Sequence, residues 1–192
     1  MRKVFLLACS GMLFALAQSS GWIPLFDGAS LNGWHPEAAA KWRVEGGILV
    51  ADSGGNGWLR SDRQFGNFLL EVDFRNSKGG NSGIFLRASA TTKPDDPSNP
   101  TTSYELQINN EDPKWATGSI EDVIQRIAVV NPAANQWHKY EVEVRGDHFI
   151  AKLDGKRVLD GRDKKIASGH IGLQHHKDSK IEFRNLRIQP LP

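Results

Sequence analysis

A regular alternation of apolar and polar residues in the stretch Gly66–Arg87 limits what this chain can fold into. Its first half has an apolar residue at every second position, namely Phe68, Leu70, Val72 and Phe74. A period of two is typical of a β-strand with one buried face. Residues 76–82 (NSKGGNS) predict a turn, because glycine and asparagine readily take a positive φ, and the alternation resumes at Ile84. The stretch therefore predicts two strands joined as a β-hairpin.

A third strand is predicted over Ser103–Asn109, with apolar residues on one face and polar residues on the other. The apolar set is Tyr104, Leu106 and Ile108. If this set packs inward, the opposite face carries Glu105 and Gln107, and strict alternation adds Arg87 from the preceding strand. One cation, one carboxylate and one amide on an open sheet face can bind a sugar, whose hydroxyls need donors and acceptors in fixed directions. The same pattern also describes an ordinary solvated face with an arginine–glutamate pair.

The rest of the chain repeats the pattern of short strands and turns. Turn signals stand at Gly46-Gly47, Gly146-Asp147 and Asp154-Gly155, and we find no convincing amphipathic helix. Such a series favours an all-β fold of two packed antiparallel sheets. Residues 91–102 (TTKPDDPSNPTT) contain three prolines and predict a surface loop. Residues 111–132 predict a long loop that could form a wall beside Glu105.

The first 17 residues predict an exported protein. Met1–Ala17 has two basic residues, an apolar run and the small-x-small sequence Ala15-Leu16-Ala17, as a secretory signal peptide does. The apolar run is too short for a transmembrane helix, so we expect no transmembrane segment in the mature chain. We expect a single domain over residues 18–192, in the periplasm or secreted.

Charge and cysteine content exclude some classes of function for the mature chain. With Arg2 and Lys3 removed, 22 basic residues balance 22 acidic ones, so nothing favours nucleic acid as a partner. The one cysteine of the sequence, Cys9, leaves with the signal peptide. Thiol catalysis and disulfides are therefore not expected.

Several motifs in one order resemble a known family. They are LFDGASLNGW, WRVEGGILV, FGNFLLEVDFRNSKGGNSGIFLR, YELQI, TGSI, the W-H-x-Y-E-V-x-V-R-G run and GHIGLQHH followed by KIEFRNLRI. This pattern resembles the 3-keto-disaccharide hydrolase domain family and covers essentially the whole mature chain. The resemblance implies a concanavalin A-like jelly roll, export, and action on oxidised glycosides as a glycosidase-type hydrolase.

The resemblance also implies a set of site residues. By position, the polar signature of the family falls on Asn81, Ser82, Gly83, Arg87, Glu105, Gln107, Gln174 and His176. Alternation within the GHIGLQHH strand places Gln174 and His176 on one face, so we expect three neighbouring strands to present one polar set. The family commonly has an aromatic residue where this chain has Glu121, so the stacking platform for a sugar is missing or is replaced by Trp115.

The expected substrate suggests a role for each residue. A ketone at C3 acidifies the C2 proton, and its removal allows the bond from C1 to the leaving oxygen to break by elimination; hydration then completes the hydrolysis. This route needs a base, an acid and donors to the enolate oxygen. We expect Glu105 and His176 to be the acid–base pair, in either order, and Arg87 to stabilise the enolate. Gln107 and Gln174 would orient substrate hydroxyls, and Asn81 and Trp115 complete the expected substrate-binding residues.

Three alternatives stay open at this stage. Glu71-Val72-Asp73 resembles the start of the laminarinase-type glucanase motif, but Arg75 and Asn76 stand where the final acid is needed. A sandwich with six tryptophans also suits a non-catalytic, lectin-like sugar-binding module. No cofactor is fixed by the sequence, although His176 with Glu105 or Asp112 could hold one divalent metal ion.

Overall fold

The computed structural model describes residues 21–192, so the expected signal peptide over Met1–Ala17 lies outside the described residues. These residues form an all-β structure in which no helix could cross a membrane. The strands are β1 (Ile23–Pro24), β2 (Trp34–Glu45), β3 (Ile48–Phe65), β4 (Phe68–Asn76), β5 (Ser82–Ala88), β6 (Thr92–Lys93), β7 (Asp96–Pro100), β8 (Tyr104–Ile108), β9 (His138–Arg145), β10 (His148–Leu153), β11 (Lys156–Arg162), β12 (Gly169–His175) and β13 (Ile181–Pro190).

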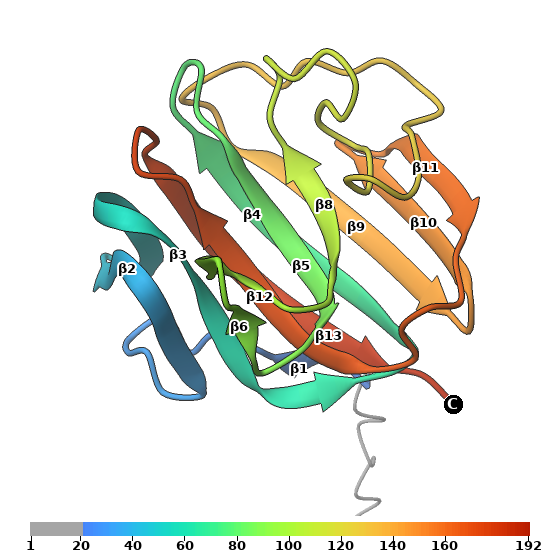
Figure 1. Cartoon of the computed structure of the whole chain (residues 1–192), viewed down its shortest axis with the longest axis horizontal. Helices are drawn as coiled ribbons and strands as arrows, with labels where there is room; N and C mark the ends of the chain where they lie inside the picture. Colours follow the sequence, from blue (N-terminus) through green and yellow to red (C-terminus); the bar gives the residue numbers. More distant parts are fainter. Residues whose placement is uncertain (1–20) are drawn as a thin grey trace, which may run out of the picture.

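All the strands except β6 and β7 form one long antiparallel sheet that folds over on itself into two layers (Figure 1). Its order is β11-β10-β9-β4-β13-β3-β12-β5-β8, and β2 runs along β3. The N-terminal part of β3 pairs with β13, whereas its C-terminal part pairs with β12, so β3 belongs to both layers. The far ends of the sheet meet across the core, where Tyr104 of β8 lies 4.5 Å from Phe149 of β10 between ring centroids. The predicted antiparallel sandwich is therefore confirmed.

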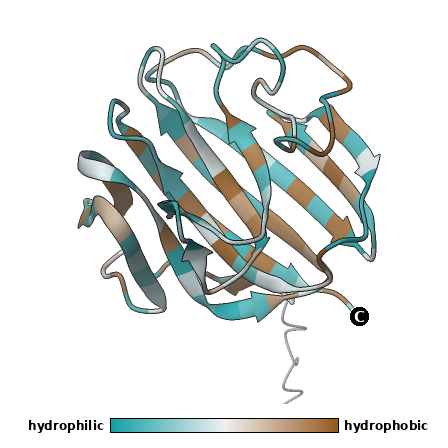
Figure 2. Ribbon diagram, in the orientation of Figure 1, coloured by the Kyte–Doolittle hydropathy of each residue, from teal (hydrophilic) through white to brown (hydrophobic). Residues whose placement is uncertain are grey.

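Alternation places one face of each strand in the core, which Figure 2 shows as bands of brown and teal along the ribbons. All the residues predicted to face inward are buried in the main core, namely Phe68, Leu70, Val72, Phe74, Ile84, Leu86, Tyr104, Leu106 and Ile108. The apolar phase changes within β13, because the pairing with β4 shifts between Arg184 and Arg187 and Asn185 has a φ of 53°.

The predicted hairpin over Gly66–Arg87 is wrong. β4 pairs with β9 and β13, whereas β5 pairs with β8 and β12, so the segment 77–81 crosses from one layer to the other. An alternating pattern fixes which residues of a strand are buried but not which strand lies beside it.

The proline-rich segment predicted as a surface loop is also different in the structure. Residues 92–100 form a small hairpin of β6 and β7, and β7 contacts β2 and β3. Ser98 and Pro100 are buried. In Figure 1 this hairpin lies over the sheet near β12. The segment 109–137 is a long loop, as expected, and carries isolated bridges rather than strands.

Candidate active site

The candidate site lies on the outer face of the layer formed by β3, β12, β5 and β8. On β5 the residues between the core positions point outward, and Phe85 packs against Trp58 of β3 with a ring-centroid distance of 5.5 Å, apart from the main core. Phe85 pairs with Glu105 on β8, and Gly83 pairs with Gln107. On the other side, Gln174 of β12 pairs with Trp58. Three neighbouring strands therefore carry Glu105, Gln107 and Gln174 on one outer face, and these are three members of the predicted polar set.

Buried polar atoms without a hydrogen-bond partner collect on this face. Within residues 21–192, seven side-chain nitrogen or oxygen atoms are buried and unpaired. Five of them belong to this face or to the residue that leads into β5: Trp58 Nε1, Asn81 Oδ1, Glu105 Oε1, Gln107 Oε1 and Gln174 Oε1. An unpaired buried polar group costs about 1–3 kcal/mol, and native proteins keep few of them. Four acceptors and one donor gathered together are thus a set of partners for hydroxyl groups.

Glu105 has the most unusual environment of these residues. Its side chain is held over Gly83, where an added Cβ would lie 2.6 Å from Glu105 Oε1, so this close approach requires a glycine. Burial, and then the neighbouring Glu121 carboxylate, raise the pKa of Glu105 well above its ordinary value, while Lys93 opposes this rise. Glu105 therefore keeps its proton to a higher pH than an exposed glutamate and can donate it.

A cleft of about 330 Å³ opens beside Glu105 on β8, the last strand of the sheet. Its walls come from the β6–β7 hairpin and the residues after it, from β8, from the long loop and from the segment before β12. The lining residues that carry charge are Lys93, Glu105, Glu121, Asp122 and Lys165. This volume is within the usual range for small-molecule sites, about 300–1,000 Å³.

The hairpin covers the inner part of the polar face. Asn99 of β7 accepts a hydrogen bond from Gln174 Nε2 at 3.4 Å. The Asp96 carboxylate holds Asn99 in place, since Asp96 Oδ2 accepts a hydrogen bond from Asn99 Nδ2 at 2.6 Å. Trp58 and Phe85 beneath it are 0% and 1% exposed, so the hairpin closes one side of the site.

Arg87 does not belong to this site, and the prediction that placed it beside Glu105 is wrong. Its φ of 55° breaks the alternation of β5, where the pairing with β12 is irregular. The side chain is 1% exposed and donates hydrogen bonds to three backbone carbonyls, those of Gly66, Gly146 and Ile166, at 2.7–2.9 Å. Arg87 therefore binds three segments that link strands, and it does not line the cleft.

Among the predicted residues, Glu105 lines the cleft, whereas Gln107, Gln174, Asn81, His176 and Trp115 do not. β12 ends at His175, which is buried, so His176 lies beyond the strand, and its side chain makes no hydrogen bond within residues 21–192. Trp115 is half-buried in the long loop, with Lys114 Nζ 4.8 Å from its ring centroid, and it does not line the cleft. The described part of the chain holds no group of three or more side chains suited to a metal ion. Asp112 instead caps its own turn by accepting from Lys114 N and Trp115 N.

The glucanase-like segment has a structural explanation. Glu71 and Asp73 lie on the outer face of the other layer. Glu71 forms ion pairs with Lys139 and Arg187 at 2.8 and 2.7 Å, and Asp73 with Arg184 at 3.3 Å. This arrangement is the ordinary solvated face of a strand.

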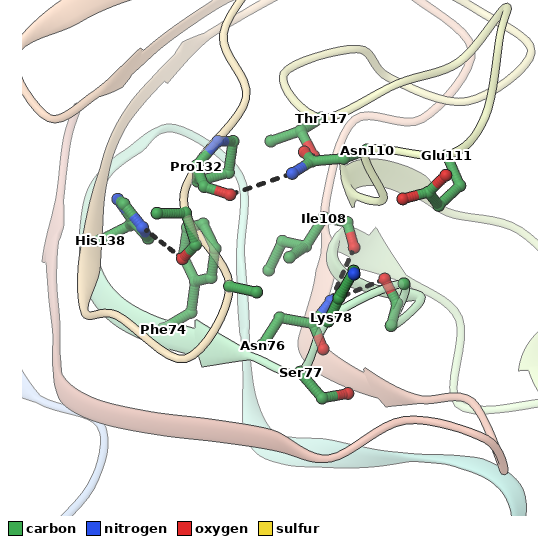
Figure 3. Close-up of a pocket in the computed structure, with 14 residues that line it drawn as sticks. Phe74, Asn76, Ser77, Lys78, Ile108, Asn110, Glu111, Thr117, Pro132 and His138 are labelled. Carbon is green, nitrogen blue, oxygen red and sulfur yellow. Dashed lines mark hydrogen bonds between the residues drawn. The ribbon is translucent and has the colours of Figure 1, made fainter.

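A second, smaller pocket lies beside the long loop and has a volume of about 90 Å³ (Figure 3). Most of its polar groups bind one another. Thr117 Oγ1 donates to Asn110 Oδ1 at 2.7 Å, and Asn110 Nδ2 donates to the Pro132 carbonyl at 3.0 Å. His138 pairs with Asp154 and with the Ala133 carbonyl. These contacts hold the loop in place and leave few groups for a ligand.

Sequence reasoning missed four residues at the site: Trp58, Lys93, Asn99 and Glu121. The sequence did mark Glu121 as unusual, because it stands where the family that the chain resembles commonly has an aromatic residue. No such signal marked the hairpin residues Lys93 and Asn99, because a loop prediction does not say which face the loop will cover.

The fold and the site define a β-sandwich with a polar site on the outer face of one layer, under a hairpin. The chain belongs to the 3-keto-alpha-glucoside-1,2-lyase-like domain family, which matches residues 21–189. A 3-keto-disaccharide hydrolase of Bacteroides thetaiotaomicron is 26% identical over 90% of this chain and 79% of that protein.

Solved structures support the same fold. A protein of Parabacteroides distasonis assigned as a glycosyl hydrolase superposes with a TM-score of 0.79 at 19% identity, covering 90% of this chain and 94% of that one. A Bacillus subtilis protein of unknown function with a galectin-like fold has a TM-score of 0.63 at 13% identity, over 88% and 94% of the two chains. At these identities the likeness shows the fold alone, and it confirms the predicted jelly roll.

Proposed function

We propose that this protein is a carbohydrate-active enzyme that cleaves 3-keto-glycosides by proton abstraction and elimination. The observation that carries the proposal is the group of unpaired buried polar atoms on one sheet face, together with a cleft lined by the Glu105 carboxyl group, whose pKa burial raises. Membership of the lyase-like family and the name of the Bacteroides relative support the substrate class.

The reaction begins at the acidified C2–H bond of the oxidised sugar. A base takes the C2 proton, and the electron pair moves to the C3 oxygen as an enolate. When the C3 carbonyl re-forms, the electrons make a double bond between C1 and C2 and expel the oxygen at C1. Glu105 donates its proton to that oxygen. Water then adds to the double bond, which gives the free 3-keto sugar.

The other polar residues bind the substrate. The amide oxygens of Gln107, Gln174 and Asn81 accept hydrogen bonds from sugar hydroxyls, and the indole nitrogen of Trp58 donates one. Each of these contacts would pair an atom that is now buried without a partner, which favours the bound state. Lys93 is the cation whose field reaches Glu105, so it can stabilise negative charge in the cleft.

The test is an assay on 3-keto-disaccharides and the matching unmodified disaccharides, with and without a chelator. We expect cleavage of the 3-keto compounds alone, and a Glu105→Gln variant should lose about 10²–10⁴-fold in turnover. Glu111→Gln, which changes an exposed carboxylate of the long loop outside the cleft, is the matched control. Calorimetric binding of either sugar without any product would instead show a lectin-like module, and cleavage of the unmodified sugar would show an ordinary glycosidase.

We also propose that the mature protein is exported through the leader at residues 1–17. Fractionation of the source cells should then find the protein in the periplasm or the medium, without these residues. Full-length protein in the cytoplasm would contradict this.

A further inference from the structure

Glu121 is fixed beside Glu105 by the backbone of the long loop. Ile120 bridges Leu106 of β8, and Glu121 N donates to the Glu105 carbonyl at 3.0 Å. A second bridge, between Ile120 and Ile124, closes the turn that carries Glu121. The loop therefore pairs with the outer edge of β8 and holds the two carboxyl groups next to each other.

The two carboxyl groups differ in their surroundings. Glu105 is 8% exposed and leaves Oε1 unpaired, whereas Glu121 is half-buried and faces the cleft. The other charged groups of the cleft come from three segments: Lys93 from β6, Asp122 from the loop and Lys165 from the link before β12. Two neighbouring carboxyl groups seldom ionise together, so the buried one keeps the proton.

We propose that Glu121 is the base that removes the C2 proton and that Glu105 is the acid that protonates the leaving oxygen. This inference rests on the proposed function, and it gives this chain a catalytic residue at a position where the resembled family commonly has an aromatic side chain. It also supplies the acid–base partner of Glu105 from a residue that lines the same cleft, which His176 does not.

The pair accounts for every proton in both half-reactions. During elimination Glu121 gains the C2 proton and Glu105 gives its own proton to the leaving oxygen. The pair therefore holds one proton before and after this step, first on Glu105 and then on Glu121. During hydration the Glu105 carboxylate takes a proton from the attacking water as oxygen bonds to C1, and Glu121 returns its proton to C2. The enzyme is then in its starting state, and no further acid or base is needed.

Deuterium exchange separates the two roles. In D₂O the wild type should exchange the C2 hydrogen of a 3-keto-glycoside that it binds. Glu121→Gln should slow this exchange about 10²–10⁴-fold, whereas Glu105→Gln should retain it and lose only the cleavage of alkyl glycosides. With a 4-nitrophenyl leaving group, which needs no acid, Glu105→Gln should recover cleavage and Glu121→Gln should not. Glu111→Gln again serves as the control.

The outcomes distinguish this inference from the proposed function. Exchange that persists in Glu121→Gln overturns the base role and leaves the 3-keto-glycosidase assignment intact. A wild type that neither exchanges nor cleaves overturns both. A titration of the Glu105 carboxyl by NMR tests the coupling without substrate: Glu121→Gln should move its midpoint to lower pH, and an unchanged midpoint would contradict the pairing. Thermal unfolding of each variant checks that the fold is retained.

Discussion

Replacement of Arg87 by methionine tests the structural role found for this residue. The substitution keeps an unbranched side chain of similar length but removes every hydrogen bond to the carbonyls of Gly66, Gly146 and Ile166. A buried carbonyl left without its partner costs about 1–3 kcal/mol, and relief of the buried charge offsets part of this. For three carbonyls we expect the free energy of unfolding to fall by about 3 kcal/mol.

The assay is urea and thermal unfolding, followed by turnover measured well below the transition. For a chain of this length a loss of about 3 kcal/mol lowers Tm by about 6–12 °C. Turnover of the folded variant should stay within about twofold of the wild type, because Arg87 does not line the cleft. Arg145→Met, at an exposed arginine paired with Glu143, should change stability by no more than about 0.5 kcal/mol.

The opposite result would refute this reasoning. A variant that unfolds like the wild type but no longer turns over would mean that Arg87 acts on substrate and that its carbonyl contacts contribute little.

Three further results are expected from the same geometry. Gly83→Ala would place a Cβ 2.6 Å from Glu105 Oε1, so the carboxyl must move and turnover should fall about 10²-fold while the far-UV circular dichroism is unchanged. The raised pKa of Glu105 means that the folded protein keeps a proton that the unfolded chain releases near pH 4.5. Wild-type stability therefore falls as pH rises from there through the folded pKa, and Glu105→Gln should gain Tm relative to wild type as the pH is raised above 4.5. Tyr140→Phe removes the 2.8 Å hydrogen bond from β9 to the Gln107 carbonyl across the core, and urea unfolding should show a loss of about 1 kcal/mol.

The sequence predicts the strands and their buried faces well because alternation is a local property. The inward set of β4, β5 and β8, and the outward set of Glu105 and Gln107, follow from a period of two alone. Pairing partners do not follow, which is why the turn after β4 was expected to close a hairpin whereas it crosses between layers.

The site is predictable only in part, for two physical reasons. A single positive φ at Arg87 reverses the direction of one side chain, and no composition signal marks it because arginine seldom takes that conformation. Lys93 and Glu121 reach the cleft from segments without regular pattern, so their positions depend on contacts that form only when the whole chain has folded.

Because β3 passes from one layer into the other, it influences how the molecule unfolds. Eighteen residues of one strand carry hydrogen bonds for both layers, and β2 follows them along their length. Neither layer can unfold while the other stays intact, because its unfolding would break the hydrogen bonds of this shared pair of strands. The sandwich is therefore one cooperative unit, and heat or denaturant should take it from native to unfolded in a single step.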